Sequence, residues 1–145
     1  MHPDEITGTT IEIAIEIHRT LGPGLLESVY EAILAHELEV RGLRVRRQQA
    51  VRFRYGDTMF EEAFRADLIV EDTVVVEIKA VAKLNAVYAR QVLTYLRLLD
   101  LSAGLVLNFG EKTMLAGTKR IVNKLPPFQQ SPVRINRTSA FHSNQ

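Results

Sequence analysis

The sequence predicts one α/β domain built on a mixed β-sheet. Three observations predict it: helical stripes of apolar residues in three segments, alternating apolar runs between the second and third of them, and turn-forming residues at the boundaries. The expected order is helix, helix, three strands, helix, strand. With 145 residues, 46% of them hydrophobic, the chain is long enough for one compact core and too short for two.

The first segment, residues 6–22, fits two interpretations. Its central IEIAIEI alternates like a strand, and isoleucine favours strands. A helical stripe also fits, with the charged side chains outside it; its members are Ile6, Thr10, Ile13, Ile17 and Leu21. We predict a helix here.

Two further helices follow from apolar periodicity. Gly22-Pro23-Gly24 breaks the chain, and a helix over 26–40 then ends before Gly42. Its expected buried residues are Val29, Ile33, Leu34 and Leu38. A helix over 85–99 follows later, with Val92, Leu93, Leu96 and Leu99 on its apolar side.

The strand predictions depend on alternation and on turn residues. Three strands are expected in the middle of the chain, at 43–55, 61–70 and 73–80, with turns at 55–57 and 71–73. The mostly apolar run at 102–110 indicates a buried strand, while residues 117–123 fit either a last strand or a helical turn. We therefore assign residues 1–125 to the domain and residues 126–145 to a flexible tail with little to bury.

Charge and composition narrow the function classes. Six arginines between Arg41 and Arg54 occur with no acid among them, which fits either a polyanion-binding surface or a solvated face. The chain contains no cysteine, and its four histidines are scattered, so disulfides and zinc spacings are excluded. Neither a membrane-spanning run nor a signal peptide is apparent, so a cytoplasmic location is expected.

The hairpin around DLIVEDTVVVEIKA holds the most unusual feature. A three-residue turn at 71–73 places Asp67 directly opposite Glu77, where like charges repel. Alternation places Phe64, Ala66, Leu68 and Val70 on the other, apolar face. Two explanations remain for the acids. Either Arg65 and Lys79 neutralise them on a solvated face, or a hard divalent cation such as Mg²⁺ lies between them.

Two helical motifs accompany the acids. Gly24, Glu27 and Tyr30 recur every three residues, and Gln91 and Tyr95 stand one helical turn apart. Each motif alone also fits an ordinary helix start or a surface amide beside a packed aromatic ring.

Taken together in this order, Gly24-x-x-Glu27-x-x-Tyr30, Asp67, Glu77-Ile78-Lys79 and Gln91-x-x-x-Tyr95 resemble the GxxExxY protein family. This family is a branch of the PD-(D/E)XK nuclease-like superfamily. The resemblance covers about residues 6–123 and includes the LVLNFG segment.

The resemblance implies a restriction-endonuclease-like core, with a four-stranded mixed sheet flanked by helices. It implies that Asp67 and Glu77 bind Mg²⁺ or Mn²⁺ with the Ile78 carbonyl, and that Lys79 is the catalytic lysine. It also implies that Glu27 joins the metal site, and that Gln91 and Tyr95 support the site or touch the nucleic-acid strand.

The expected function is a metal-dependent nuclease acting on DNA in preference to RNA. The alternatives are a non-catalytic module that binds nucleic acid or protein, and a hydrolase of another phosphate substrate. An exposed edge strand could pair with a second copy, so we also expect a homodimer.

Overall fold

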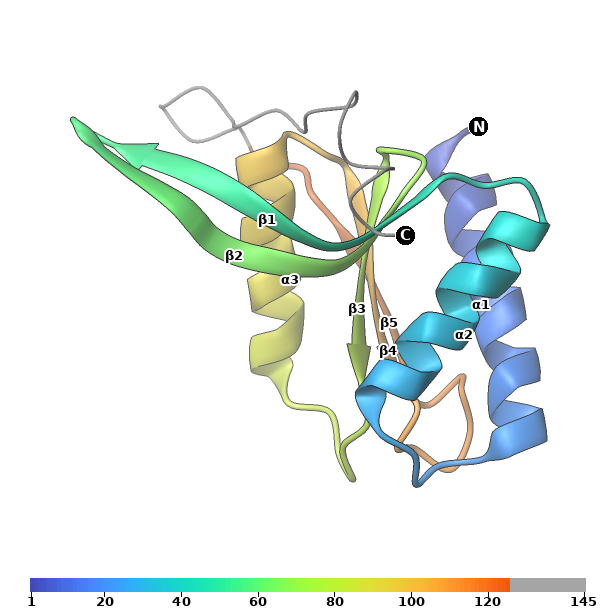
Figure 1. Cartoon of the computed structure of the whole chain (residues 1–145). Helices are drawn as coiled ribbons and strands as arrows, with labels where there is room; N and C mark the ends of the chain where they lie inside the picture. Colours follow the sequence, from blue (N-terminus) through green and yellow to red (C-terminus); the bar gives the residue numbers. More distant parts are fainter. Residues whose placement is uncertain (126–145) are drawn as a thin grey trace.

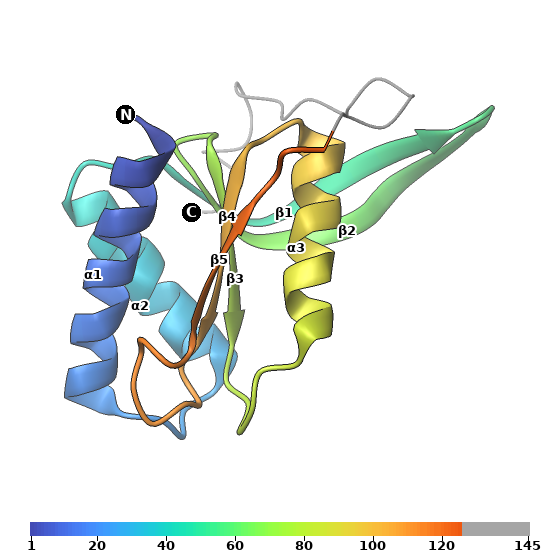
Figure 2. The same ribbon diagram turned by 180° about the vertical axis from the view of Figure 1, so that it is seen from behind.

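The computed structural model describes residues 1–125 as a three-layer α/β domain (Figures 1 and 2). Helices α1 (Pro3–Leu21) and α2 (Glu27–Val40) cover one face of the sheet, and α3 (Ala86–Leu99) covers the other. The predicted tail, 126–145, lies outside the described residues.

Within residues 1–125 the sheet is mixed and has five strands, in the order in which they occur along the chain. Their bounds are β1 Val45–Tyr55, β2 Thr58–Val70, β3 Val74–Lys79, β4 Ala103–Asn108 and β5 Thr118–Val122. Only β3 and β4 run parallel, and α3 forms the crossover between them. The predicted fold class is confirmed, but the strand count of four was one too low: the segment left open between strand and helical turn forms β5.

The helices follow the predicted apolar stripes with local differences. The first segment is a helix, with Ile6, Thr10, Ile13 and Ile17 buried, whereas Leu21 at its end is 42% exposed. In α2 the buried face is rotated from the predicted one: Val29 is exposed and Tyr30 is fully buried. The reason is the packing of Tyr30, whose ring stacks on Phe109 with centroids 4.5 Å apart.

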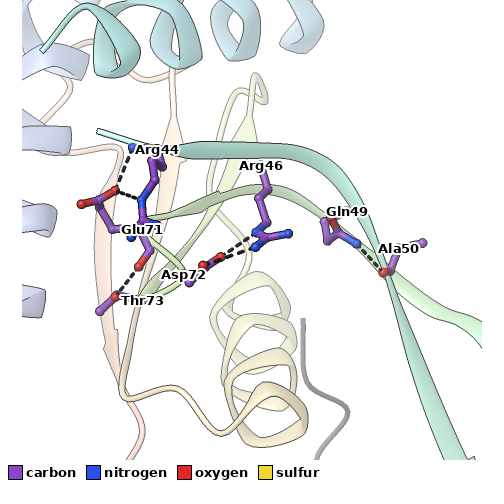
Figure 3. Close-up of polar contacts among 7 residues, drawn as sticks. All are labelled: Arg44, Arg46, Gln49, Ala50, Glu71, Asp72 and Thr73. Carbon is purple, nitrogen blue, oxygen red and sulfur yellow. Dashed lines mark hydrogen bonds and ion pairs between the residues drawn. The ribbon is translucent and has the colours of Figure 1, made fainter. Parts of the chain in front are cut away.

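The β2–β3 turn is the predicted one, and two ion pairs hold it to β1 (Figure 3). Glu71 and Asp72 both adopt positive φ angles, of 54° and 52°, which L-residues rarely adopt. Glu71 bonds Arg44, and Asp72 forms a buried pair with Arg46, whose side chain is fully inaccessible to solvent. These pairs compensate for the strained turn and fix the start of β1 against it.

In the long ribbon formed by β1 and β2, alternate residues do not stay on one side of the sheet along the whole ribbon. Leu68 and Val70 pack with the cluster beneath α1 and α2, whereas Phe64 and Ala66 pack with the cluster beneath α3. The prediction that these four share one face was therefore wrong. The β1–β2 register runs to Arg47↔Leu68 and resumes at Gln49↔Ala66, and Gln48 between them has φ 49°, so the alternation of faces is broken there.

Candidate active site

The candidate site lies where β2 separates from β3. These two strands pair only over the three positions next to the turn, from Val70↔Val74 to Leu68↔Val76. At the next position, Asp67 and Glu77 replace the regular ladder with side-chain bonds. The N–H of Asp67 donates to Glu77 Oε1 at 3.2 Å, and the N–H of Ile78 donates to Asp67 Oδ2 at 2.8 Å.

Burial makes this acid pair electrostatically unusual. Glu77 is only 8% exposed. Desolvation first, and then the negative charge of Asp67, raise the pKa of Glu77 to about 8, while the nearby Lys79 charge lowers it. Near neutral pH the Glu77 carboxyl is therefore largely protonated when no cation is bound. A bound cation would take the place of this proton.

Lys79 lies two residues beyond Glu77, on the same face of β3. Its ammonium group lies over the ring of Tyr88 from α3, with Nζ 4.6 Å from the ring centroid. Such a contact holds a cation in place without neutralising it. Tyr88 therefore positions the ammonium group of Lys79.

The end of β3 is clamped by the LVLNFG segment. The buried side chain of Asn108 bonds both the N–H and the carbonyl of Val81, each at 2.9 Å, and the N–H of Phe109 donates to the Lys79 carbonyl at 2.8 Å. Gly110 is required here because a Cβ would lie 2.2 Å from the Val81 carbonyl oxygen. This clamp fixes the backbone at Lys79 and just after it.

Two residues that sequence reasoning missed complete the polar network. Gln48 Nε2 donates to Glu31 Oε1 at 2.6 Å and to Asp67 Oδ1 at 3.2 Å, so one amide joins α2 to β2. Glu31 also accepts from Arg47 at 3.2 Å. Burial and then the charge of Asp67 raise the pKa of Glu31, which shows that the two carboxylates are close enough to interact.

The remaining predicted residues lie around this centre. Glu27 is exposed at the start of α2, one turn before Glu31, and within residues 1–125 no hydrogen bond or ion pair joins it to Asp67 or Glu77. Tyr95 faces the acids from α3: burial, then the charges of Glu77 and Asp67, raise the pKa of its hydroxyl. Gln91 is exposed one turn before Tyr95.

Tyr30 of the first helical motif has a structural role instead. Its hydroxyl donates to the Gly22 carbonyl at 2.6 Å and accepts from the Leu25 N–H at 3.1 Å. It thereby closes the loop between α1 and α2 and sets the rotation of α2. Glu27 and Glu31 share one side of this helix, and Glu31, one turn further from its start, is linked to Asp67 through Gln48.

The arginine cluster is not a free basic surface. Five of its six members form ion pairs, which are Arg41–Glu12, Arg44–Glu71, Arg46–Asp72, Arg47–Glu31 and Arg52–Glu61. The acids come from distant segments, so the sequence alone did not reveal this neutralisation. The interpretation of the cluster as a polyanion-binding surface loses most of its support.

Comparison with known proteins identifies the family. Residues 4–121 match the family model described as the PD-(D/E)XK nuclease superfamily. The chain belongs to the PD-(D/E)XK nuclease superfamily. No curated protein and no solved structure matches it significantly. The narrower resemblance to GxxExxY proteins stays a prediction, while the five-stranded sheet flanked by helices is consistent with the restriction-endonuclease-like fold of the superfamily.

PD-(D/E)XK nucleases generally use divalent metal ions, and the donors present here fit such an ion. No group of three or more His, Asp or Glu side chains with metal-binding geometry occurs in the described part of the chain. Mg²⁺, however, needs only one or two carboxylates, because water fills its other positions. Asp67 and Glu77 supply such a pair of hard oxygen donors. None of the helices within residues 1–125 has the length and apolarity that crossing a bilayer requires.

Proposed function

We propose that this PD-(D/E)XK protein is a metal-dependent nuclease that hydrolyses phosphodiester bonds, with DNA preferred over RNA. The observation that carries the proposal is the close acid pair of the half-buried Asp67 and the buried Glu77, with Lys79 on the same strand as Glu77. A like-charged pair shielded from water destabilises a fold, so it indicates a functional site when it lies beside a cation.

Mg²⁺ or Mn²⁺ would be held by Asp67 and Glu77, with the Ile78 carbonyl as a further ligand. Such an ion lowers the pKa of a bound water and polarises a phosphoryl oxygen. Between the two helical acids, we assign the supporting role to Glu31, because Gln48 links it to Asp67. Glu27, one helical turn before Glu31, remains the alternative.

The other residues would act on the substrate. Lys79 would orient the attacking water or stabilise the charge that develops on the phosphate as the 3′-oxygen leaves. Tyr88 supports this role by fixing the ammonium group. Tyr95 and Gln91, which share one side of α3, would contact the nucleic-acid strand or support the site.

A non-catalytic binding module is the competing interpretation. Its support is that the acid pair can persist without an ion when Glu77 is protonated. Against it, a surface that binds phosphate gains nothing from a pair of acids that repels phosphate. The ion pairs of the arginine cluster weaken its contribution to phosphate binding in both interpretations.

A cleavage assay tests the proposal directly. Plasmid and oligonucleotide substrates are incubated with Mg²⁺ or Mn²⁺ and, as a blank, with EDTA. Asp67→Asn, Glu77→Gln and Lys79→Ala should each lower the rate at least a hundredfold, in the range typical of electrostatic catalytic groups. Lys83→Ala and Glu61→Gln, exposed charges outside the network, should retain the rate. Metal-dependent cleavage that survives both Asp67→Asn and Lys79→Ala contradicts the assignment.

The predicted homodimer and cytoplasmic location remain expectations. The sheet ends in β1 on one side and β5 on the other, and either edge could pair with a second copy. Sedimentation analysis would separate monomer from dimer. A monomer at the concentrations used for cleavage would contradict the dimer without affecting the nuclease proposal.

A further inference from the structure

A row of aromatic side chains begins in the candidate site and continues onto the β1–β2 ribbon. Tyr95 stacks on Phe64 of β2, with ring centroids 3.9 Å apart and planes inclined by 2°. Phe53 of β1 packs against the same cluster. Phe64 precedes Asp67 by three residues on the same strand, β2. The row and the site therefore adjoin each other.

The row continues toward the tip of the ribbon. Phe60 is directly opposite Phe53 in the register, so both side chains leave the ribbon on the same face. Tyr55 follows two residues after Phe53 and shares that face. Phe60 is 50% exposed and Tyr55 is 70% exposed. Figures 1 and 2 show that this part of the ribbon reaches past α3, away from α1 and α2.

The charge of the ribbon does not suit a duplex-binding arm. Residues 50–65 carry three arginines and three acids, which cancel. Two of the arginines form pairs within the ribbon, Arg52 with Glu61 at 3.6 Å and Arg65 with Glu62 at 2.7 Å. Gripping a duplex by its phosphates requires an excess of Lys and Arg. Stacking on bases requires only ring faces, and in a duplex the bases are not available for it.

We propose that Tyr55 and Phe60 form a stacking platform for unpaired bases, so that the substrate is single-stranded nucleic acid or a single-stranded end. The inference rests on the proposed nuclease function, because the row leads a strand from the platform past Phe64 and Tyr95 to the acid pair. A second protein copy fits the patch less well. Two aromatic rings bury about 150–250 Å² each, whereas a stable interface needs about 800 Å² per partner.

The test measures binding without cleavage. Fluorescence anisotropy in EDTA gives the Kd of a labelled oligothymidylate, a hairpin duplex and an abasic oligomer of equal length. Tyr55→Leu and Phe60→Leu keep an apolar side chain but remove the ring, and each should weaken oligothymidylate binding about tenfold. Phe60→Tyr keeps the ring and should retain the wild-type Kd. Leu115→Ala, at a site 72% exposed outside the ribbon, is the matched surface control and should also retain it.

Three results would overturn the platform. The first is unchanged oligothymidylate binding in both leucine variants, and the second is an abasic oligomer that the wild type binds as tightly as oligothymidylate. The third is a change of sedimentation coefficient in Phe60→Leu, which would mark a protein interface. The outcomes also separate the two proposals. Cleavage by the wild type with normal binding by the leucine variants refutes only the platform. Absence of cleavage with weakened binding in those variants refutes only the nuclease.

Discussion

Asp67 and Glu77 each bind the backbone of the other's strand. The Asp67 N–H donates to Glu77 Oε1, and the Ile78 N–H donates to the Asp67 carboxylate. The two acids thus take over the hydrogen bonds that a regular ladder would supply at the point where β2 leaves β3. This arrangement keeps the buried carboxyl group of Glu77 close to the half-buried one of Asp67. Their proton and cation affinities are therefore coupled to the stability of the fold.

Stability in EDTA should fall as the pH rises toward 9. The pKa of Glu77 is raised from 4.5 in the unfolded chain to about 8 in the folded one. A raised pKa means that the folded state binds the proton more tightly. The contribution of Glu77 to the free energy of unfolding is thus complete below about pH 4.5 and is lost as the pH rises through about 8. The expected loss is a few kcal/mol, since each pKa unit corresponds to about 1.4 kcal/mol.

Urea unfolding at pH 5, 7 and 9 measures this effect. Glu77→Gln should show a much flatter pH dependence, whereas Glu61→Gln, a fully exposed acid of β2, should follow the wild type. The raised pKa of Glu31 acts in the same direction, so some slope should remain in Glu77→Gln. Equal slopes in the wild type and Glu77→Gln would contradict the buried, protonated Glu77.

Divalent cations should stabilise the protein more at higher pH. A ligand that binds only the folded state raises the thermal midpoint. Because the cation replaces the proton on Glu77, the apparent Kd for Mn²⁺ should fall about tenfold per pH unit between pH 6 and 8. Thermal shifts over a Mn²⁺ series at three pH values measure this. Asp67→Asn should lose the shift, and a shift independent of pH would place the ion elsewhere.

The Arg46–Asp72 pair should be essential to the fold. Both side chains are buried, with the Arg46 side chain 0% and the Asp72 side chain 4% exposed. Asp72→Ala removes the carboxylate that pairs with the buried guanidinium of Arg46, which should destabilise the folded state by about 3–5 kcal/mol. The thermal midpoint should fall by roughly 6–20 °C for a chain of this size. Glu61→Ala, which removes an exposed ion pair, should leave the midpoint unchanged, and an equal fall in both variants would refute the distinction.

The elements of this fold were predictable because local sequence specifies them. The turn at Glu71–Thr73 and the register that opposes Asp67 to Glu77 follow from alternation on either side of three residues. In α1 the helical stripe of apolar residues predicted the structure correctly, and the strand-like alternation of IEIAIEI did not. Burying the stripe on a sheet outweighs the strand propensity of isoleucine. The acid pair was identified for the same reason: its two members belong to one hairpin.

The parts that could not be predicted depend on contacts between distant segments. The reversal of faces along β2 depends on the positive φ of Gln48 in the neighbouring strand. The choice of Glu31 over Glu27 depends on how far along α2 each acid lies from Gln48 and Asp67, which belong to distant segments of the sequence. One signal was present: Glu31 follows Glu27 by one helical turn, so both acids were candidates for the same face.

Replacing each helical acid should separate their roles. Glu31→Gln keeps the shape of the side chain but removes a charge that interacts with Asp67. Metal-dependent cleavage should fall about 10- to 100-fold, the range seen when groups that support metal ligands are removed. Glu27→Gln, at the exposed start of α2, should keep at least half of the rate. The reverse order of the two effects, measured by single-turnover cleavage, would restore Glu27 as the helical acid of the site.

Gln48→Gly should separate activity from stability. Gln48 has φ 49°, a conformation that strains an L-residue by about 1–2 kcal/mol and that glycine adopts freely. The substitution relieves that strain but removes the amide that bonds Glu31 and Asp67. The thermal midpoint should therefore stay close to that of the wild type, while metal-dependent cleavage falls at least tenfold. Gln48→Ala loses the amide without relieving the strain, so it should lose activity and stability together. Wild-type cleavage by Gln48→Gly would show that the amide serves only to join α2 to the sheet.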